Sequence, residues 1–317
     1  MLASTLLLAL QNVILKLIFH PHPVWTALGG WVQPSPLHSV VLLHVRTGLM
    51  MVLLMALAPR LYPALGSTLQ SVLARIPSQA KPFNRLSAGL SSLCLCLALI
   101  LLYMAIGQLP TGVAVTLFSI YPAITSALAW WMWRDPFTLW RGLILLLILA
   151  GVALTGFVPT GVWAPNWLGI LSALGAGSLY AGYLLFAQAS LSPDAGRHTP
   201  LPPLVFSMLT FIGTWLLTGS IVLLRLVDIT FQNGWAIGWV SLLSAMTALA
   251  AYLLNNSGIQ HIGAAKAAII SASGPIFTAL LGWVLLRETL ALHQLVGATL
   301  VTLGLVGISL TPRPRQP

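Results

Sequence analysis

The chain has 317 residues, of which 58% are hydrophobic and 6% are Asp, Glu, Lys or Arg. A soluble domain carries about 25% charged residues, so this chain could not cover its surface in water, and a soluble enzyme, a nucleic-acid binder and a disordered protein are excluded. We therefore expect an all-α polytopic membrane protein whose surroundings are the lipid bilayer, and we interpret the net charge of +10 as an orientation signal.

Ten apolar runs approach the length of about 20 residues that a membrane helix needs. Gln11, Asn12 and Lys16 interrupt the first run, which has no basic n-region and no cleavage site, so we interpret it as a retained membrane helix. Apolar residues at helical spacing in the break 59–85 predict a short helix on the membrane surface. In chain order, the predicted spans are 2–19, 37–58, 86–107, 110–133, 139–157, 166–190, 203–225, 235–256, 262–286 and 291–311.

The basic residues predict the orientation of these spans. If both termini are cytoplasmic, the outer loops hold two basic residues, Arg225 and Arg287. Cytoplasmic loops are enriched in Lys and Arg, so we expect cytoplasmic N- and C-termini. A bacterial cytoplasmic membrane is the expected location, with an organelle membrane as the alternative. The inner loops and the C-terminus then hold nine basic residues: Arg60, Arg75, Lys81, Arg85, Arg134, Arg141, Arg197, Arg313 and Arg315.

The sequence contains an internal repeat without gaps, at a shift of 153 positions. Each half holds five spans, an odd number, so the halves 1–158 and 159–317 are predicted to lie in the membrane with opposite orientations. Inverted repeats recur in secondary transporters, whose substrate site lies near the midplane between the halves. The matched pairs are Pro122 and Pro275, Thr125 and Thr278, Trp130 and Trp283, Arg134-Asp135 and Arg287-Glu288, Leu139 and Leu292, and Gly151 and Gly304.

These residues resemble the drug/metabolite transporter superfamily, in its ten-helix branch with two EamA-type repeats. Asn12, Lys16 and Arg46 match the first two helices of that branch, whereas Arg134-Asp135-Pro136 departs from its usual Gly-Glu. The second half matches at Pro275, Gly282, Glu288, Gln294, Gly297 and Gly304.

The resemblance implies a secondary carrier without a cofactor. Its central cavity would be lined mainly by the third, fourth, eighth and ninth helices. The implied activity is export of a small metabolite, amino-acid-like or an organic anion, by alternating access. An exchanger of sugar phosphates or nucleotide sugars is the alternative, and a homodimer stays open.

Three cations lie within the predicted spans, Lys16, Arg46 and Lys266, whereas no Asp or Glu does. They therefore lack an obvious partner inside the membrane, and a carboxylate or phosphate on the substrate would supply one. Alternatively, Lys16 and Lys266 reach the interface with their flexible stems, and Arg46 pairs with backbone carbonyls or with an acid in a loop.

Polar and aromatic residues on the expected cavity helices are further candidates for substrate contact. Any one of them could instead join helices to each other. Pro122 and Pro275 are candidate gating residues because a mid-helix proline kinks the chain, although a static bend is the alternative. The polar candidates are Asn12, Tyr103, Ser119, Tyr252, Asn255, Asn256 and Ser271.

Other classes of function have less support in the sequence. There is no H-E-x-x-H, no G-x-S-x-G and no P-loop pattern, so we expect neither a membrane enzyme nor an ATPase. His20, His22 and His38 have no cysteine or acid nearby, so no metal site is expected. Small residues at Ala173, Gly177 and Ala181, and at Gly297, Gly304 and Gly307, predict close helix packing.

Overall fold

The computed structural model describes residues 1–21, 29–61, 82–133, 139–156, 166–191, 201–224, 234–271, 273–288 and 290–309, without some side chains inside the helices. Within these ranges every regular element is an α-helix, which confirms the all-α prediction. The helices are α1 (Leu2–Phe19), α2 (Pro36–Leu61), α4 (Pro82–Gln108), α5 (Thr111–Phe118), α6 (Tyr121–Trp133), α7 (Leu139–Gly156), α8 (Trp167–Leu191), α9 (Pro203–Leu223), α10 (Gly234–Ser271), α11 (Gly274–Leu286) and α12 (Leu292–Ser309).

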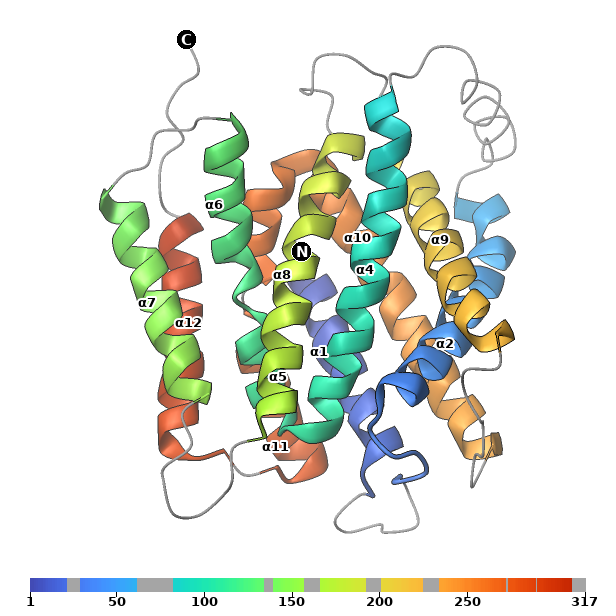
Figure 1. The fold of residues 1–317 in the computed structure, drawn as a ribbon, viewed down its shortest axis with the longest axis horizontal. Coiled ribbons are helices and arrows are strands. Elements are labelled where there is room, and N and C mark those ends of the chain that lie inside the picture. Colours follow the sequence, from blue (N-terminus) through green and yellow to red (C-terminus); the bar gives the residue numbers. More distant parts are fainter. Residues whose placement is uncertain are drawn as a thin grey trace.

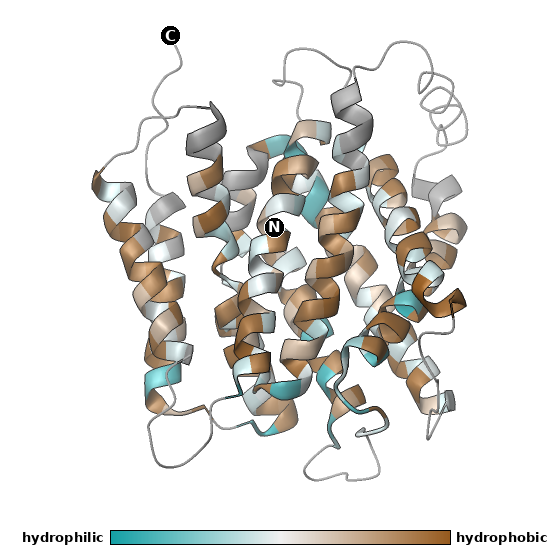
Figure 2. Cartoon of the chain, viewed as in Figure 1, coloured by the Kyte–Doolittle hydropathy of each residue, from teal (hydrophilic) through white to brown (hydrophobic). Residues whose placement is uncertain are grey.

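The helices form one bundle (Figure 1), and hydrophobic residues predominate along them (Figure 2). Six of them are long and apolar enough to cross a membrane, and four shorter apolar helices accompany them. Large apolar side chains stay exposed on the outer surface of the bundle, for example Leu139, Leu216 and Leu303. Such a surface is stable only against lipid, so the prediction of a multi-pass membrane protein is confirmed.

Two predicted spans are broken rather than kinked, which corrects the prediction. The span 110–133 is divided at Ser119 and Ile120 into α5 and α6, and the span 262–286 is divided between the end of α10 and α11. Pro122 and Pro275 are each the second residue of the new helix. Proline lacks a backbone N–H and fits the first turn of a helix, so each proline starts a helix here instead of bending one.

The prediction of a loop near residues 257–261 is also wrong. These residues belong to α10, which is 38 residues long and has no break there. At 1.5 Å per residue a straight helix of this length would far exceed the bilayer core of about 30 Å. In Figure 1 the ribbon of α10 rises from the lower edge and turns over near the upper edge. The proposed surface helix and the boundary between residues 158 and 159 fall largely outside the described residues.

Helices from the two halves of the sequence pack against each other throughout the bundle. The main pairs are α4 with α8, α1 with α10 and α11, α2 with α9, and α7 with α12. At the α7–α12 contact, glycine allows the two helix backbones to come close together. A Cβ on Gly151 would lie only 2.7 Å from the carbonyl oxygen of Gly297. Ala173 and Ala181 are fully buried, so the predicted close packing of both small-residue faces is confirmed.

Candidate functional site

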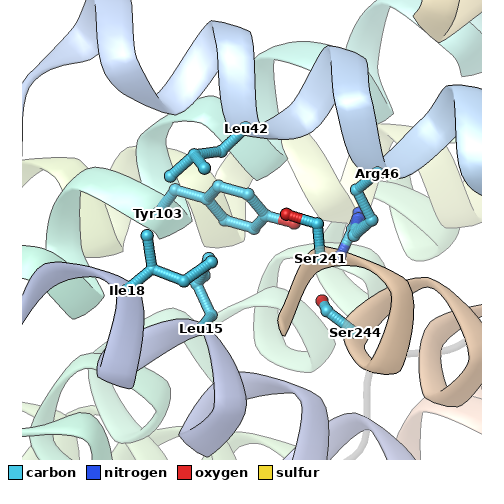
Figure 3. Close-up of a pocket in the computed structure, with 7 residues that line it drawn as sticks. All are labelled: Leu15, Ile18, Leu42, Arg46, Tyr103, Ser241 and Ser244. Carbon is cyan, nitrogen blue, oxygen red and sulfur yellow. The ribbon is translucent and has the colours of Figure 1, made fainter. Parts of the chain in front are cut away.

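A narrow pocket lies between α1, α2, α4 and α10 (Figure 3). Its walls combine an apolar side from α1 and α2 with a polar side from α2, α4 and α10. As packed here, the pocket has no volume that a water molecule could occupy, so a solute enters only if the helices move. The lining residues are Leu15, Ile18, Leu42, Arg46, Tyr103, Ser241 and Ser244.

Arg46 is the charged residue of this pocket, and it is 2% exposed. Its guanidinium carbon lies 5.1 Å from the centre of the Tyr103 ring, within the range of a cation–π contact. Tyr252, on α10, is a further neighbour of the guanidinium. The Arg46 Nε and Nη1 atoms have no hydrogen-bond partner among the described residues. A buried charge with free donors is costly, so this arginine is suited to an anionic ligand.

Two hydroxyls of the pocket are unpaired in the same way. The Tyr103 Oη and the Ser244 Oγ are buried and have no hydrogen-bond partner in the described part of the chain. Figure 3 shows the Tyr103 ring pointing toward the Arg46 side of the pocket, and the Ser241 hydroxyl pointing toward the hydroxyl end of Tyr103. The arginine nitrogens can only donate hydrogen bonds, whereas the hydroxyls can donate or accept. The seven lining residues include no carboxylate.

Asn256, in contrast, is held by the protein itself. The Tyr183 hydroxyl donates to Asn256 Oδ1 at 2.9 Å, and Asn256 Nδ2 donates to Ser207 Oγ at 2.7 Å. These bonds tie α8, α10 and α9 together. The neighbouring Asn255 is 3% exposed, and its Nδ2 has no partner among the described residues. The structure therefore separates two amides that the sequence treats alike.

A cluster of aromatic rings continues from this network into the bundle. The Tyr180 ring centre lies 5.0 Å from that of Tyr121 and 5.2 Å from that of Tyr183. Phe118 packs against both Tyr121 and Tyr180. These tyrosines are buried. The geometry places them in the bundle interior beside the amide network.

The other candidates are less directly connected to the pocket. Asn12 is 7% exposed on α1, and the Ser119 Oγ donates to the carbonyl oxygen of Val115 within its own helix. Ser271 ends α10 close to the Tyr121 hydroxyl. Lys266 belongs to α10, but its side chain lies outside the description. Sequence reasoning missed Gln11 as a candidate, although it precedes Asn12; it is 3% exposed and its Nε2 is unpaired within the described ranges.

The expectation that Lys16 lacks a partner in the membrane is wrong. Its Nζ donates to the carbonyl oxygens of Ile106 and Leu109, each at 2.7 Å, and lies 4.0 Å from Glu288 Oε1. The sequence places Glu288 in an outer loop, but the chain folds this carboxylate inward against the start of α5. Among the described residues, no group of three His, Cys, Asp or Glu side chains could hold a metal ion.

Comparison with known proteins identifies a family and several relatives of this chain. Residues 167–310 match the model of the EamA-like transporter family. The uncharacterized transporter sll1319 of Synechocystis is 34% identical over 316 residues, which covers 96% of this chain and 90% of the relative. The uncharacterized transporter YwfM of Bacillus subtilis is 30% identical over 231 residues, covering 72% of this chain and 74% of the relative.

Two further similarities are more limited in what they show. A probable 4-amino-4-deoxy-L-arabinose-phosphoundecaprenol flippase subunit, ArnE of Sodalis glossinidius, is 36% identical over 68 residues, covering 22% of this chain and 61% of the subunit. A solved crystal structure with 16% sequence identity aligns with a TM-score of 0.57 and covers 98% of this chain and 94% of its own. At this identity the match shows the fold alone.

Proposed function

Because the chain belongs to the EamA-like transporter family, it is a membrane transporter, and we propose that it exports a small anionic metabolite through the Arg46 pocket by alternating access. Membership confirms the predicted resemblance and the expectation of a transporter rather than an enzyme. The observation that carries the proposal is the buried guanidinium of Arg46, with Nε and Nη1 unpaired beside two unpaired hydroxyls.

The chemistry of the pocket favours an anion over a zwitterion or a cation. Carboxylate and phosphate oxygens accept hydrogen bonds, and such charge-assisted bonds are roughly twice as strong as neutral ones. The ammonium group of an amino acid would find only uncharged hydroxyl acceptors beside the positive guanidinium, because the pocket lining has no carboxylate. We therefore narrow the substrate class from amino-acid-like compounds or organic anions to organic anions, with carboxylate or phosphate groups.

Alternating access is supported by the pairing of helices between the halves. If the chain is ten spans in two inverted repeats, each helix of the first half corresponds to a helix of the second half. The α4–α8 contact then corresponds to the α1–α10 contact. In the same way, the α6–α8 contact corresponds to α1–α11, and α4–α9 corresponds to α2–α10. All of these contacts are present. The two helix breaks before Pro122 and Pro275 occupy corresponding positions, where gating by half-helices would occur.

The first test is a thermal-shift screen of the purified protein with succinate, citrate and phosphoenolpyruvate against leucine, glutamine and putrescine. A ligand at 100 times its Kd stabilises a protein by roughly 2.7 kcal/mol, which shifts the melting temperature measurably. We expect stabilisation by an anion, and its loss in Arg46→Gln. Uptake of the radiolabelled anion into inside-out vesicles then tests export. Stabilisation by putrescine or leucine that survives Arg46→Gln would overturn the proposal.

The donor-rich pocket also fits the phosphate of an obligate exchanger, which is the second candidate function. Exchange predicts flux of a sugar phosphate only when vesicles contain a substrate on the opposite side. Flux into empty vesicles at an equal rate would exclude it. Both arms use the same reconstituted protein, so the two functions are compared directly.

A further inference from the structure

A polar cluster that the transport pocket does not use lies at the lower edge of the bundle in Figure 1, where α1, α4 and α11 end and α5 begins. We define the outer cluster as Lys16, Thr111 and Glu288. Glu288 Oε2 accepts a hydrogen bond from the backbone N–H of Thr111 at 2.9 Å, and Oε1 accepts one from the Thr111 hydroxyl at 2.8 Å. Lys16 Nζ lies 4.0 Å from Oε1.

Glu288 caps the N-terminus of α5, which has no capping side chain of its own. Thr111 is the first residue of α5, and the preceding Pro110 provides no side-chain cap. The first N–H groups of a helix lack partners and carry a partial positive charge, which a carboxylate satisfies well. The cap for α5, in the first half of the sequence, therefore comes from the second half.

The backbone conformation at the end of α11 directs the Glu288 side chain toward the N-terminus of α5. Arg287 has a φ of +52°, the left-handed conformation, and the N–H of Glu288 donates to the carbonyl oxygen of Gly282 at 3.2 Å. This bond, after a left-handed residue, satisfies a carbonyl group near the C-terminus of α11. The carboxylate then lies over Gly282, where a Cβ would be 2.8 Å from Glu288 Oε2. Glycine at 282 leaves room for the acid.

The same end of the bundle is closed by further contacts. Lys16 donates to the carbonyl oxygens of Ile106 and Leu109 at the end of α4. Gly112 lies against α11, where a Cβ would be 3.1 Å from the Cβ of Ala279. Lys16 is also next along α1 to Leu15, which lines the Arg46 pocket. These contacts join three helices of the first half to α11 on the side of the pocket that the predicted topology places outside.

We propose that the outer cluster is the outer gate of the transporter, closed in this structure, and that the bonds between Glu288 and Thr111 break whenever the pocket opens outward. The inference rests on the proposed alternating access and topology, but it concerns residues other than those of the pocket. Glu288 and Thr111 act as positioning residues that set the balance between closed and open states.

The test measures access to the pocket without any substrate. In a Cys94→Ser/Cys96→Ser background, Ser244→Cys places a thiol in the pocket, and an impermeant maleimide is applied to the outside of intact cells. Loss of charge-assisted hydrogen bonds is expected to raise the open population, so Glu288→Gln labels about tenfold faster than the parent. Thr111→Val should also label faster, whereas the control Thr111→Ser keeps the hydroxyl and should match the parent.

A cross-link provides the reverse measurement. Gly112→Cys with Ala279→Cys places two Cβ atoms within a few tenths of an ångström of disulfide geometry. Copper-phenanthroline is expected to form the bond, more slowly when Glu288→Gln is also present, and dithiothreitol should restore the anion flux that the bond abolishes. Flux that continues through the cross-linked protein, or equal labelling of the Glu288→Gln variant and its parent, would overturn the gate. Labelling that responds as expected in a protein without anion flux would retain the gate and reject only the substrate proposal.

Discussion

At the scale of single residues, Arg46 combines a cost in stability with a benefit in binding. Its side chain is 2% exposed, and two of its nitrogens lack hydrogen-bond partners within the described structure. Burial of a charge without full compensation destabilises the folded protein by several kcal/mol. Under the proposed function, an anion bound in the pocket would offset this cost.

Arg46→Gln should therefore not destabilise the ligand-free protein. We expect a melting temperature equal to or above that of the wild type, because the variant removes an uncompensated buried charge. An arginine with a purely structural role would give the opposite result, a loss of about 3–5 kcal/mol on breaking its contacts. Differential scanning fluorimetry in detergent distinguishes the two, with Arg46→Lys as the charge-retaining control.

His20 gives a prediction about pH at the outer edge. Burial and the neighbouring charge of Lys16 lower the pKa of His20 from its ordinary value of 6.5, against a hydrogen bond to the Gly107 carbonyl oxygen. The folded state therefore prefers neutral His20 more than the unfolded state does. Its contribution to stability is present above pH 6.5 and is lost as the pH falls toward the lower folded pKa. His20→Gln should weaken the fall in melting temperature below pH 6.5; an unchanged pH profile would contradict this.

The sequence could predict part of the site because the free-energy cost of placing a residue in the membrane depends on its type. Arg46, Tyr103 and Tyr252 were predicted as candidates for substrate contact, and they lie together in the structure. A buried cation on an apolar helix is expected to have polar or aromatic neighbours. Lys16 was misinterpreted because its partner, Glu288, is distant in the sequence and lies between two predicted spans. Ser244 and Gln11 were missed because an isolated serine or amide gives no signal until the fold shows that its hydrogen bonds are unmade.

At the scale of helices, sequence predicted where apolar segments lie better than how they end. Apolar length is a strong signal in a membrane, so the segments of α1, α2, α4 and α7–α9 were predicted within a few residues. A proline predicts either a kink or a new helix start, and the local sequence is the same for both. The breaks before Pro122 and Pro275 depend on contacts with neighbouring helices, as does the continuation of α10 past residue 256.

The glycines on α7 and α12 give a matched test of helix packing. Gly151→Ala would place a methyl group 2.7 Å from the Gly297 carbonyl oxygen and 2.8 Å from the Val301 backbone nitrogen. Overpacking of this kind costs about 1–3 kcal/mol, so we expect a lower melting temperature. Gly238→Ala, on α10, meets nothing within 4 Å and should be neutral or stabilising by up to about 1 kcal/mol. Equal effects of the two substitutions would show that the α7–α12 contact is looser than described.

At the scale of the whole molecule, the distribution of charge and the arrangement of helices agree with one orientation. The ends of α2, α6, α8 and α12 lie at the upper edge of the bundle in Figure 1. The segments that follow them in the sequence hold six basic residues: Arg75, Lys81, Arg134, Arg197, Arg313 and Arg315. A further basic residue, Arg85, lies early in α4. We therefore propose that the upper edge is cytoplasmic.

Reporter fusions test this orientation. A fluorescent protein after Pro317 should fold and emit, because the C-terminus is predicted to be cytoplasmic. Alkaline phosphatase fused after Leu224, at the end of α9, should be active because that edge is predicted to be outside. The reverse pattern of both reporters would invert the proposed direction of transport and the assignment of the outer gate.

The close α7–α12 contact has a mechanical consequence. A Cβ on Gly151 or Gly304 would collide with the facing helix, so the two backbones approach almost without side chains between them. Interfaces of this kind resist sliding, since a shift along the axis would bring a bulkier residue such as Val301 or Ile148 against the opposite backbone. Rotation about the seam meets no such obstacle. If the halves move as we propose for alternating access, we expect the line where α7 touches α12 to act as their hinge axis, fixed in length.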